Sequence, residues 1–539
     1  MLAGAALLFC YLRVAGATQV NSDGDGLVLQ ASDMLHGNLL LHGWWDTDVS
    51  FITTELPEYM AVTAVAGVRP EVVHVCAALT YTLLVLLAAF VARGRARGAE
   101  GVVRALLAAT VMLAPQPNGP TVVLLGSPDH VGTGVPLLVL LLLLDWAGQP
   151  RSWVRWLVPG CVTVLLALTI VGDALAEVVG VVPLVIACLL RAGRIIVARR
   201  DDPDASEGAW RAVLYEVSLA AAAVIAVPAA KAVNRLIRAL GGYRLGPATY
   251  HPLPWHRVVQ DAPLLWRSVL ALFGADYAGV TGAGNVAFAL AHLAGVAVVI
   301  AAVIFAAWRL IRPARGAPLG DLVADILVLA VVVNIAAYLL VVPINNIYSA
   351  HEIGPVLGLG AALTGRMLGG PLLRFRPSGR RLPGARDRGP KTGWPVLVPV
   401  LAAAVAGYVL LLGIAAASPQ RMPQNVHLAT WLRQHHLSSG LAPYWQASSV
   451  TVNSGGRVTM LAIKAEGKKH RIAPYPWESD VRLANPATHT ANFIVIVPGT
   501  GISAKFAVEV FGKPARTYQY APYVIMVWRK NLLSELGQA

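Results

Sequence analysis

Residues 73–92, "VHVCAALTYTLLVLLAAFVA", form a mostly apolar run, and Arg93, Arg95 and Arg97 follow it closely. A helix of about 20 apolar residues is long enough to cross the hydrocarbon core of a bilayer. Connections rich in Lys and Arg stay on the cytoplasmic side of a membrane. This stretch therefore predicts a membrane-spanning helix whose C-terminal end lies in the cytoplasm.

The rest of the chain repeats this pattern. Of its 539 residues, 56% are hydrophobic and only 13% are charged, which is far from the balance of an average soluble domain. We predict about eleven transmembrane helices, although the short runs at 102–115 and 133–147 would also suit re-entrant segments. The runs cover 2–20, 73–92, 102–115, 133–147, 153–172, 174–190, 212–232, 284–309, 320–342, 351–370 and 394–417.

Arginine-rich connections alternate along the chain with connections that hold few cations. This alternation predicts a cytoplasmic N-terminus and places everything after residue 417 outside. The first run would also suit a signal peptide ending at Ala15-Gly16-Ala17, but it lacks a basic leading segment, which favours a retained helix. The abundance of Arg and Ala suggests a GC-rich bacterial genome, so we predict a multi-pass protein of a bacterial cell membrane.

Two domains follow from this topology. Residues 1–417 are predicted to form a mainly α transmembrane domain with outer loops at 18–72, 116–132 and 233–283, and residues 418–539 an extracytoplasmic α/β domain. In the second domain Asn425 is a candidate cap for a helix through "VHLATWLRQHHL". Four β-type runs follow, of which a turn at 453–456 joins the first two. They are "SSVTV", "RVTMLAI", "NFIVIV" and "YVIMVW".

The first outer loop is acidic, unlike the rest of the chain. Its stretch "LVLQASDMLHGNLL" has apolar residues at helical spacing, which predicts an amphipathic helix along the membrane surface. The apolar face comprises Leu27, Ala31, Met34 and Leu35. Acids near a membrane are often simply solvated, but here a whole cluster faces the single cation Arg69. The cluster comprises Asp23, Asp25, Asp33, Asp46, Asp48, Glu55, Glu58 and Glu71.

The stretch "DGDGLVLQASDMLHGN", residues 23–38, resembles the start of GT-C glycosyltransferases, multi-span enzymes that use polyprenyl-phosphate-linked sugars. The shared features are Asp23 just after the first span, Ala31, the pair Asp33-Met34 and Gly37-Asn38. The many spans and the stretch "GLAPYWQASSVTV" before a Gly-rich turn are similar to actinobacterial members. The resemblance implies that Asp23 is a catalytic carboxylate. The sequence departs from the family at Gly24, where many members have a second acid, and Asp25 is the candidate replacement.

One carboxylate suffices for the chemistry that this resemblance implies. A base must accept the proton of the acceptor hydroxyl, while a lipid phosphate is already a good leaving group. Hydrolysis of a sugar ether differs, because its leaving alkoxide needs a second, protonated carboxyl group. Direct displacement predicts inversion at the sugar carbon.

The third outer loop holds cations on the side of the membrane where the topology rule predicts few. They suit a donor phosphate, because charge-assisted hydrogen bonds stabilise phosphate oxygens. Pairing with the acidic first loop or with lipid head groups is the alternative. The candidate phosphate-binding residues are Arg244, Arg257, His251 and His256.

Two further polar pairs sit at the mouths of spans. They are Asp129-His130 in "SPDHVGTG" and His351-Glu352 in "NNIYSAHEIGP". Such groups either mark the membrane interface or orient the substrates. A neighbouring His and acid also admit a metal, but no metal-binding spacing such as HxxxH appears, so the identity of any metal stays unknown.

The stretch "WWDTDVSF" contains Asp46 and Asp48 at the spacing of a DxD motif. Alternation in an extended loop would place both carboxylates on one side, where they hold a divalent cation such as Mg or Mn or contact the acceptor. A monophosphate donor does not require such a cation, so no cofactor is predicted as essential. The supporting or acceptor-binding set is therefore Asp25, Asp48, Asp46, Glu55, Asp129, His130, His351 and Glu352. Trp44 and Trp45 either stack on a sugar or, more commonly for tryptophan, anchor the loop at the membrane.

The sequence predicts an inverting glycosyltransferase that moves mannose, arabinose or a similar sugar from a polyprenyl-phosphate donor to a glycan, lipid or protein of the cell envelope. A lipid-linked glycan flippase is an alternative, although few ionisable residues line the spans. A non-catalytic envelope scaffold is another, with Tyr444, Trp445 and Trp477 as carbohydrate-binding aromatics, a role that packing would equally explain. The predicted partners are the lipid-linked donor, the envelope acceptor and membrane lipids, with no nucleic acid.

Overall fold

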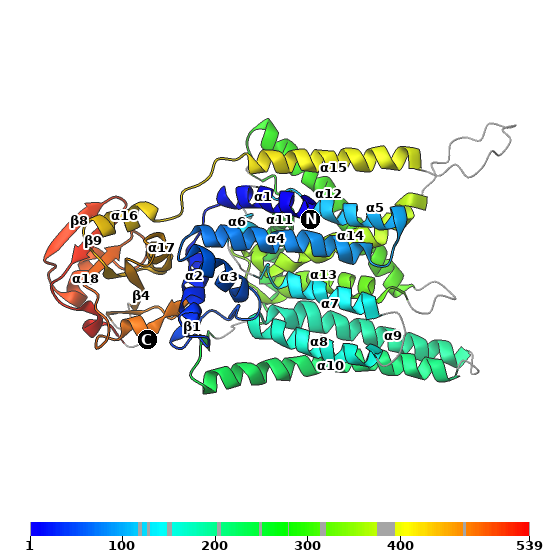
Figure 1. Cartoon of the computed structure of the whole chain (residues 1–539), viewed down its shortest axis with the longest axis horizontal. Coiled ribbons are helices and arrows are strands. Elements are labelled where there is room, and N and C mark those ends of the chain that lie inside the picture. Colours follow the sequence, from blue (N-terminus) through cyan, green and yellow to red (C-terminus); the bar gives the residue numbers. More distant parts are fainter. Residues whose placement is uncertain are drawn as a thin grey trace.

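The computed structural model describes residues 2–116, 121–126, 130–147, 154–201, 206–246, 251–278, 280–312, 320–374, 394–466 and 470–537. Long helices lie side by side in a bundle, and a smaller α/β domain packs at one end of it (Figure 1). Within the described residues, seven helices are long and apolar enough to cross a membrane, and further apolar helices are shorter. The chain is a multi-pass membrane protein.

Each of the eleven predicted runs forms a helix. This agreement reflects a simple cause: an apolar segment in a bilayer must satisfy its backbone hydrogen bonds internally, which a helix does. The helices are α1 (Leu2–Gly16), α4 (Glu71–Arg93), α5 (Gly98–Met112), α7 (Gly134–Ala147), α8 (Val154–Gly172), η1 (Glu177–Val181) with α9 (Val182–Asp201), α10 (Ser206–Ala239), α12 (Ala283–Ile311), α13 (Leu322–Val341), α14 (Gly354–Arg374) and α15 (Trp394–Ala416).

Helix α14 is the centre of the bundle and packs against α4, α5, α12 and α13. Its sequence "GPVLGLGAALTGRMLGG" is rich in small residues, which let neighbouring backbones approach closely in a membrane. A Cβ added to Gly365 would lie 2.1 Å from the backbone carbonyl oxygen of Arg104 in α5. The glycine therefore fixes how closely these two helices pack.

A layer of short elements covers one end of the bundle (Figure 1). Its helix α2 runs across the spans, and its apolar residues Leu27, Ala31 and Met34 are buried, as predicted, although Leu35 is 43% exposed. These side chains pack on α3, α4 and α17 rather than on lipid. The layer comprises α2 (Ser22–Leu35), β1 (Trp44–Asp46), α3 (Leu56–Ala66), α6 (Thr121–Leu125), β2 (Arg244–Leu245), α11 (Trp255–Leu272) and η2 (Ile347–Ile353).

The C-terminal domain is built on a six-stranded sheet of order β5-β4-β3-β7-β9-β8. Strands β4 and β7 flank β3 in parallel, and the other pairs are antiparallel. The elements are α16 (Val426–Gln434), β3 (Ser439–Ala442), α17 (Tyr444–Asn453), β4 (Thr459–Glu466), β5 (Arg471–Pro474), β6 (Ser479–Asp480), η4 (Val481–Ala484), β7 (Phe493–Ile496), α18 (Ala504–Phe511), β8 (Arg516–Tyr520), β9 (Tyr523–Val527) and η5 (Leu532–Glu535).

The predicted α/β character of this domain is confirmed, as are the helix after Asn425 and three of the four strands. The fourth prediction was wrong: "SSVTV" lies in helix α17, where Ala447 and Val450 are buried in the domain core. Tertiary packing therefore outweighs the β propensity of its Val and Thr residues. Asn425 precedes α16 without capping it, because its amide binds the Trp445 carbonyl and the Tyr523 hydroxyl instead.

A small sheet of order β2-β1-β6 ties three distant parts of the chain together. Trp45 of the first outer loop pairs with Arg244 of the third loop and with Ser479 of the C-terminal domain. The two domains are thereby joined by backbone hydrogen bonds directly beside α2.

Candidate active site

Asp23 lies in the first turn of α2, one residue inside the helix rather than before it as the sequence predicted. Asn21 caps the helix: its Oδ1 accepts from the Gly24 N–H at 3.3 Å, and its Nδ2 donates to Asp23 Oδ2 at 2.7 Å. The positive end of the helix dipole also stabilises a carboxylate there. This setting favours the ionised form of Asp23, which is the form that a general base needs.

The C-terminal domain reaches the same carboxylate through Tyr444, the first residue of α17. Its hydroxyl oxygen lies 2.5 Å from Asp23 Oδ1 and 2.5 Å from Glu478 Oε2. Glu478, just before β6, is only 4% exposed. Glu478 was absent from the sequence prediction, because nothing in its local sequence links it to a helix more than 400 residues away.

Asp25 and Gly24 explain how the first turn departs from the family pattern. Asp25 is buried, and its burial, followed by the nearby Asp23 and Glu71 carboxylates, raises its pKa well above the usual range, although the neighbouring Ser449 hydroxyl opposes the rise. A Cβ on Gly24 would approach Val73 to 2.7 Å. A second acid therefore does not fit at residue 24, and Asp25 is held in its neutral form.

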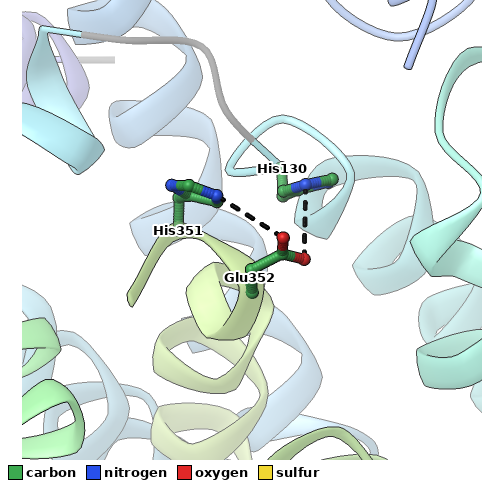
Figure 2. Close-up of side chains that lie close together, drawn as sticks. All are labelled: His130, His351 and Glu352. Carbon is green, nitrogen blue, oxygen red and sulfur yellow. Dashed lines mark ion pairs between the residues drawn. The ribbon is translucent and has the colours of Figure 1, made fainter. Parts of the chain in front are cut away.

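A second polar cluster lies in the same outer layer, at the mouths of the spans. Glu352 sits between two histidines: its Oε2 is 3.7 Å from His130 Nε2, and its Oε1 is 3.6 Å from His351 Nε2 (Figure 2). One ligand atom from each of the three residues lies within 4.8 Å of the others. This donor set fits a divalent cation, since imidazole and carboxylate are ordinary ligands for such ions.

His130 is oriented by a further acid. Its Nδ1 lies 2.9 Å from Asp173 Oδ2, which also accepts a short hydrogen bond from Thr133. Burial opposes ionisation of Asp173, but His130 and the hydrogen bonds outweigh it, so its pKa is lowered. A carboxylate behind a histidine fixes the orientation of the ring, as is usual around metal ligands.

Asp48 and Glu55 extend this cluster. Asp48 lines a cavity of about 210 Å³ together with five other polar residues, and the remaining walls are apolar; the five are His130, Asp173, Asn334, Tyr338 and Glu352. Those walls include Leu175, Val178, Ala337, Val341 and Val342. Glu55 is buried, and burial raises its pKa to about 8, with the nearby Asp173 adding to the rise. Glu55 is therefore mainly neutral at pH 7.

The structure separates Asp46 from Asp48 and corrects the interpretation of the tryptophans. Asp46 is 1% exposed and accepts a hydrogen bond from Gln30 Nε2 at 2.7 Å, away from the cavity that Asp48 lines. Trp44 is buried in the core under α2 and donates to Asp33 at 2.8 Å, so it is no membrane anchor. Trp45 lies under the Arg244 guanidinium at 5.4 Å. Of the two acids in the DxD motif, Asp46 is a buried packing residue, whereas Asp48 lines the 210 Å³ cavity.

None of the four predicted phosphate-binding cations is among the described residues that line the 210 Å³ and 240 Å³ cavities. Arg257 pairs with Asp261 at 3.6 Å, an acid of its own helix, and Arg244 is exposed beside Trp45. His251 and His256 are exposed. Asp129 lies outside the described residues. Asp261 belongs to α11 and not to the acidic first loop, so this pair is neither of the two predicted arrangements. The described residues around the 210 Å³ cavity include none of these four cations.

A cleft of about 240 Å³ separates α2 from the C-terminal domain. Glu478 and Arg482 both line it, and Arg482 binds Asp33 at 2.6 Å and Asp480 at 2.8 Å. Hydroxyl groups also line it, from Ser32, Ser448, Thr451 and Thr459. Trp445 and Trp477 are 48% and 38% exposed.

No protein-family model and no curated protein matches the sequence. Among solved structures, ArnT from Cupriavidus metallidurans bound to undecaprenyl phosphate matches with a TM-score of 0.50 at 13% identity, covering 97% of this chain and 96% of that one. The archaeal oligosaccharyltransferase AglB from Archaeoglobus fulgidus, in complex with an inhibitory peptide and a dolichol-phosphate, matches with a TM-score of 0.45 at 12% identity, covering 91% and 69%. The chain has the GT-C fold.

The GT-C fold confirms the architecture that the resemblance implied. In this fold Asp23 lies in the layer that covers one end of the bundle, and His130, His351 and Glu352 come together although the first two are 221 positions apart. A spacing search missed this trio because its members come from two elements. Asp173 and Thr133 were also missed as supporting residues. The signal that pointed to the trio was the position of each pair at the mouth of a span.

A third cavity, of about 540 Å³, lies at the opposite end of the GT-C bundle, where α4 and α9 end. Its lining is charged, but acids and arginines are matched. Arg366 binds Asp145 at 2.6 Å and Asp321 at 2.9 Å, and Arg191 binds Glu216 at 3.0 Å. Although this cavity is larger than the outer ones, its ion pairs tie helices together, and we assign it no chemistry.

Proposed function

We propose that this protein is an inverting glycosyltransferase that moves a sugar from a polyprenyl-phosphate carrier to a hydroxyl acceptor, with Asp23 as the general base. The observation that carries this proposal is the position of Asp23. Its carboxylate is held at a helix N-terminus by Asn21 and Tyr444, in the layer that also contains the two outer cavities. The sugar is mannose, arabinose or a similar residue.

The 210 Å³ cavity suits the donor. An isoprenoid chain would lie against its apolar walls, and the phosphate would lie at its polar end, near Asp48, His130 and Glu352. Acids alone would repel a phosphate, so this end needs a positive charge. A divalent cation such as Mg or Mn, held by His130, His351 and Glu352, would supply it by neutralising charge on the phosphate oxygens.

The 240 Å³ cleft between α2 and α17 suits the acceptor. It begins at Glu478, which contacts Tyr444 beside Asp23, and its hydroxyl and carboxyl lining matches a polyhydroxylated molecule. Planar polar side chains such as the Asp480-Arg482 pair form the directional hydrogen bonds that orient sugar hydroxyls. The acceptor would thus approach Asp23 from the C-terminal domain, while the donor approaches from the bundle.

In this reaction the acceptor O–H bond breaks and Asp23 takes the proton. The acceptor oxygen forms a bond to the anomeric carbon as the bond from that carbon to the phosphate oxygen breaks. The electron pair leaves with the phosphate. A single displacement inverts the anomeric configuration.

The test is transfer from labelled polyprenyl-phosphate mannose and polyprenyl-phosphate arabinose by purified enzyme in vesicles. Asp23→Asn should lower kcat by at least about 100-fold, the usual contribution of a general base. Glu509→Gln, a half-exposed carboxylate on α18, is the control and should retain full activity. Transfer that persists in Asp23→Asn would contradict the assigned base. Retention of configuration in the product, measured by NMR, would contradict the single displacement.

The arginine distribution predicts that this layer faces the outside of a bacterial membrane. Labelling of a single cysteine introduced at exposed Lys505 by a membrane-impermeant maleimide, in a variant that lacks the native cysteines, should occur in intact cells. Labelling only after lysis would reverse the orientation.

A further inference from the structure

Helix α10 ends in an exposed row of cations, Lys231, Arg235 and Arg238, which we call the basic stripe. These residues are three or four positions apart, a spacing that places their side chains on one face of a helix. The Lys231 side chain is 59% exposed and lies 4.0 Å from Glu177. Within the part of the chain that the structure describes, neither arginine side chain has an ion-pair partner. The stripe is therefore open to an anionic ligand.

The opposite side of the same helical turns is apolar and is exposed too. Val233, Leu236 and Leu240 are 40%, 59% and 58% exposed, and Leu240 directly follows the last residue of α10. With 3.6 residues per turn, these three side chains lie about half a turn around the helix from the basic stripe. The end of α10 thus exposes a cationic side and an apolar side.

A third side of this helix end is fixed against the protein. Ala230 is buried, and Asn234 Oδ1 accepts a hydrogen bond from the Tyr243 hydroxyl at 2.8 Å. Ile237 packs on the apolar core of the layer that contains α2. These contacts set the rotation of the helix about its axis, so the cationic side and the apolar side keep their directions.

Helix α10 is long enough to carry the basic stripe to the surface of a membrane. It lies at the edge of the bundle, and this end of it is beside the layer that contains α2 (Figure 1). Its 34 residues span about 50 Å, whereas the hydrocarbon core of a bilayer is about 30 Å thick. The apolar run in its sequence ends at residue 232, so Arg235 and Arg238 follow about one and two turns later. That position corresponds to the head-group layer.

The combination of these two sides fits the interface of a membrane that contains anionic lipids. Large apolar side chains exposed to water are unfavourable, whereas the same side chains are stable against lipid, which places this helix end in the interface. Lys and Arg at that depth attract anionic lipids. The planar guanidinium group matches phosphate oxygens with charge-assisted, bidentate hydrogen bonds.

We propose that the basic stripe is a binding site for the head groups of anionic membrane phospholipids. The lipid phosphate accepts hydrogen bonds from Arg235 and Arg238, and Lys231 adds a third positive charge. The bound lipid holds the end of α10, which leads directly to β2 and so to the pairing of β2 with Trp45 of β1. This lipid site is separate from the proposed catalysis and does not depend on Asp23 being the base.

The test is a titration of the purified full-length protein in detergent with phosphatidylglycerol, with bound lipid measured by native mass spectrometry. Phosphatidylcholine, which has no net charge, is the reference lipid. The double variant Arg235→Gln/Arg238→Gln should bind phosphatidylglycerol about 25-fold more weakly than the wild type, because each cation near an anionic lipid contributes about fivefold. Its affinity for phosphatidylcholine should equal that of the wild type.

Two further variants separate the position of the charge from its removal. Arg235→Lys/Arg238→Lys keeps both charges and should stay within about threefold of the wild-type affinity, since lysine also binds phosphate as a point charge. Lys513→Gln/Arg516→Gln removes two exposed cations from the C-terminal domain and is the matched control, with unchanged affinity. The unfolding temperature without added lipid should be the same in the wild type and in both arginine variants, because these side chains are exposed.

A second titration, with undecaprenyl phosphate, distinguishes membrane phospholipid from the lipid carrier of the proposed function. Its tightest binding should be the same in the wild type and in Arg235→Gln/Arg238→Gln. The phospholipid site is overturned if this variant keeps the wild-type affinity for phosphatidylglycerol, or if its affinity for undecaprenyl phosphate falls as far. It is also overturned if the control variant or the lysine variant loses as much phosphatidylglycerol affinity as the glutamine variant.

Discussion

The two ends of the helix bundle both bury ionisable side chains, but they pair them differently. At the inner end, buried Arg366 binds Asp145 and Asp321. At the other end, Asp23 accepts a hydrogen bond from Asn21 and contacts Tyr444, and the buried Glu55 has Thr54, Asp173, His130 and Glu58 as neighbours. A buried ion pair holds its charges in place, whereas burial of a carboxyl group among other acids favours its neutral form.

The pKa of a buried acid shifts in opposite directions at the two ends of the bundle: it is lowered at Asp321 and raised at Glu55. Although burial opposes ionisation of Asp321, the adjacent Arg366 guanidinium outweighs it and lowers the pKa of Asp321. At Glu55 burial, with the nearby Asp173 and Glu58 carboxyl groups, outweighs the opposing effects of Thr54 and His130 and raises the pKa to about 8. Cavity volume alone would select the inner end, at about 540 Å³, over the outer cavities. The two ends therefore differ in how burial and neighbouring charges set the pKa of their acids, and cavity volume does not report this difference.

The largest expected effect concerns Arg366, at the end of the bundle where buried arginines and acids form ion pairs. Arg366→Ala leaves Asp145 and Asp321 without their shared partner and should destabilise the protein by about 4 kcal/mol, because a buried pair is broken on one side only. The measurement is thermal unfolding of the purified protein in detergent. Arg95→Ala, whose side chain is 47% exposed, is the control and should change little. A small effect at Arg366 would show that the inner network is not structural.

The next largest effect concerns the buried carboxyl group of Glu55, at the end of the bundle that holds Asp23. Its pKa is raised to about 8, so the folded protein favours the neutral form of Glu55. The contribution of Glu55 to the free energy of unfolding is therefore complete below the ordinary pKa of a glutamate and is lost as the pH rises through 8. Glu55→Gln removes this titration and should make the protein more stable than the wild type by about 3 kcal/mol at pH 9. Unfolding scans from pH 5 to 9 measure the slope. Glu177→Gln, a carboxylate one-third exposed beside Lys231, should leave the slope unchanged.

A smaller effect should appear at the candidate metal centre. His351→Ala removes one of three ligands and should lower the affinity for Mn²⁺ by about tenfold, measured as the shift in unfolding temperature with added MnCl2. The exposed His427 provides the control variant His427→Ala. Equal Mn²⁺ affinity in both variants would remove the assignment.

The smallest effect on stability is expected at the cleft. Arg482 is 43% exposed, so Arg482→Ala should cost under about 1 kcal/mol of stability, as is usual for exposed ion pairs. Its effect should instead be on the acceptor, as a several-fold rise in KM with kcat nearly constant. Lys530→Ala, which removes a surface pair with Glu535, is the matched control. A fall in kcat with an unchanged KM would place the acceptor elsewhere.

Much of the architecture could be predicted from the sequence. The eleven apolar runs became helices, and the amphipathic α2 has its apolar face buried. The error at "SSVTV" arose because β-branched residues favour strands locally, while the packing of α17 against β4 and α2 decides the outcome. Trp44 was misread because tryptophan is commonest at membrane interfaces, yet here it fills the core beneath α2.

The sequence by itself determined the membrane topology pattern, the position of Asp23 after the first span and the α/β character of the tail. These features depend on local periodicity, composition and charge, which a linear chain displays directly. Only the tertiary structure decided which distant side chains come together. Tyr444 contacts Asp23 and Glu478, and His130 lies beside His351 and Glu352. The tertiary structure also gives Asp46 and Asp48 different surroundings. Those contacts join residues from distant segments, and no local pattern encodes the packing that brings such segments together.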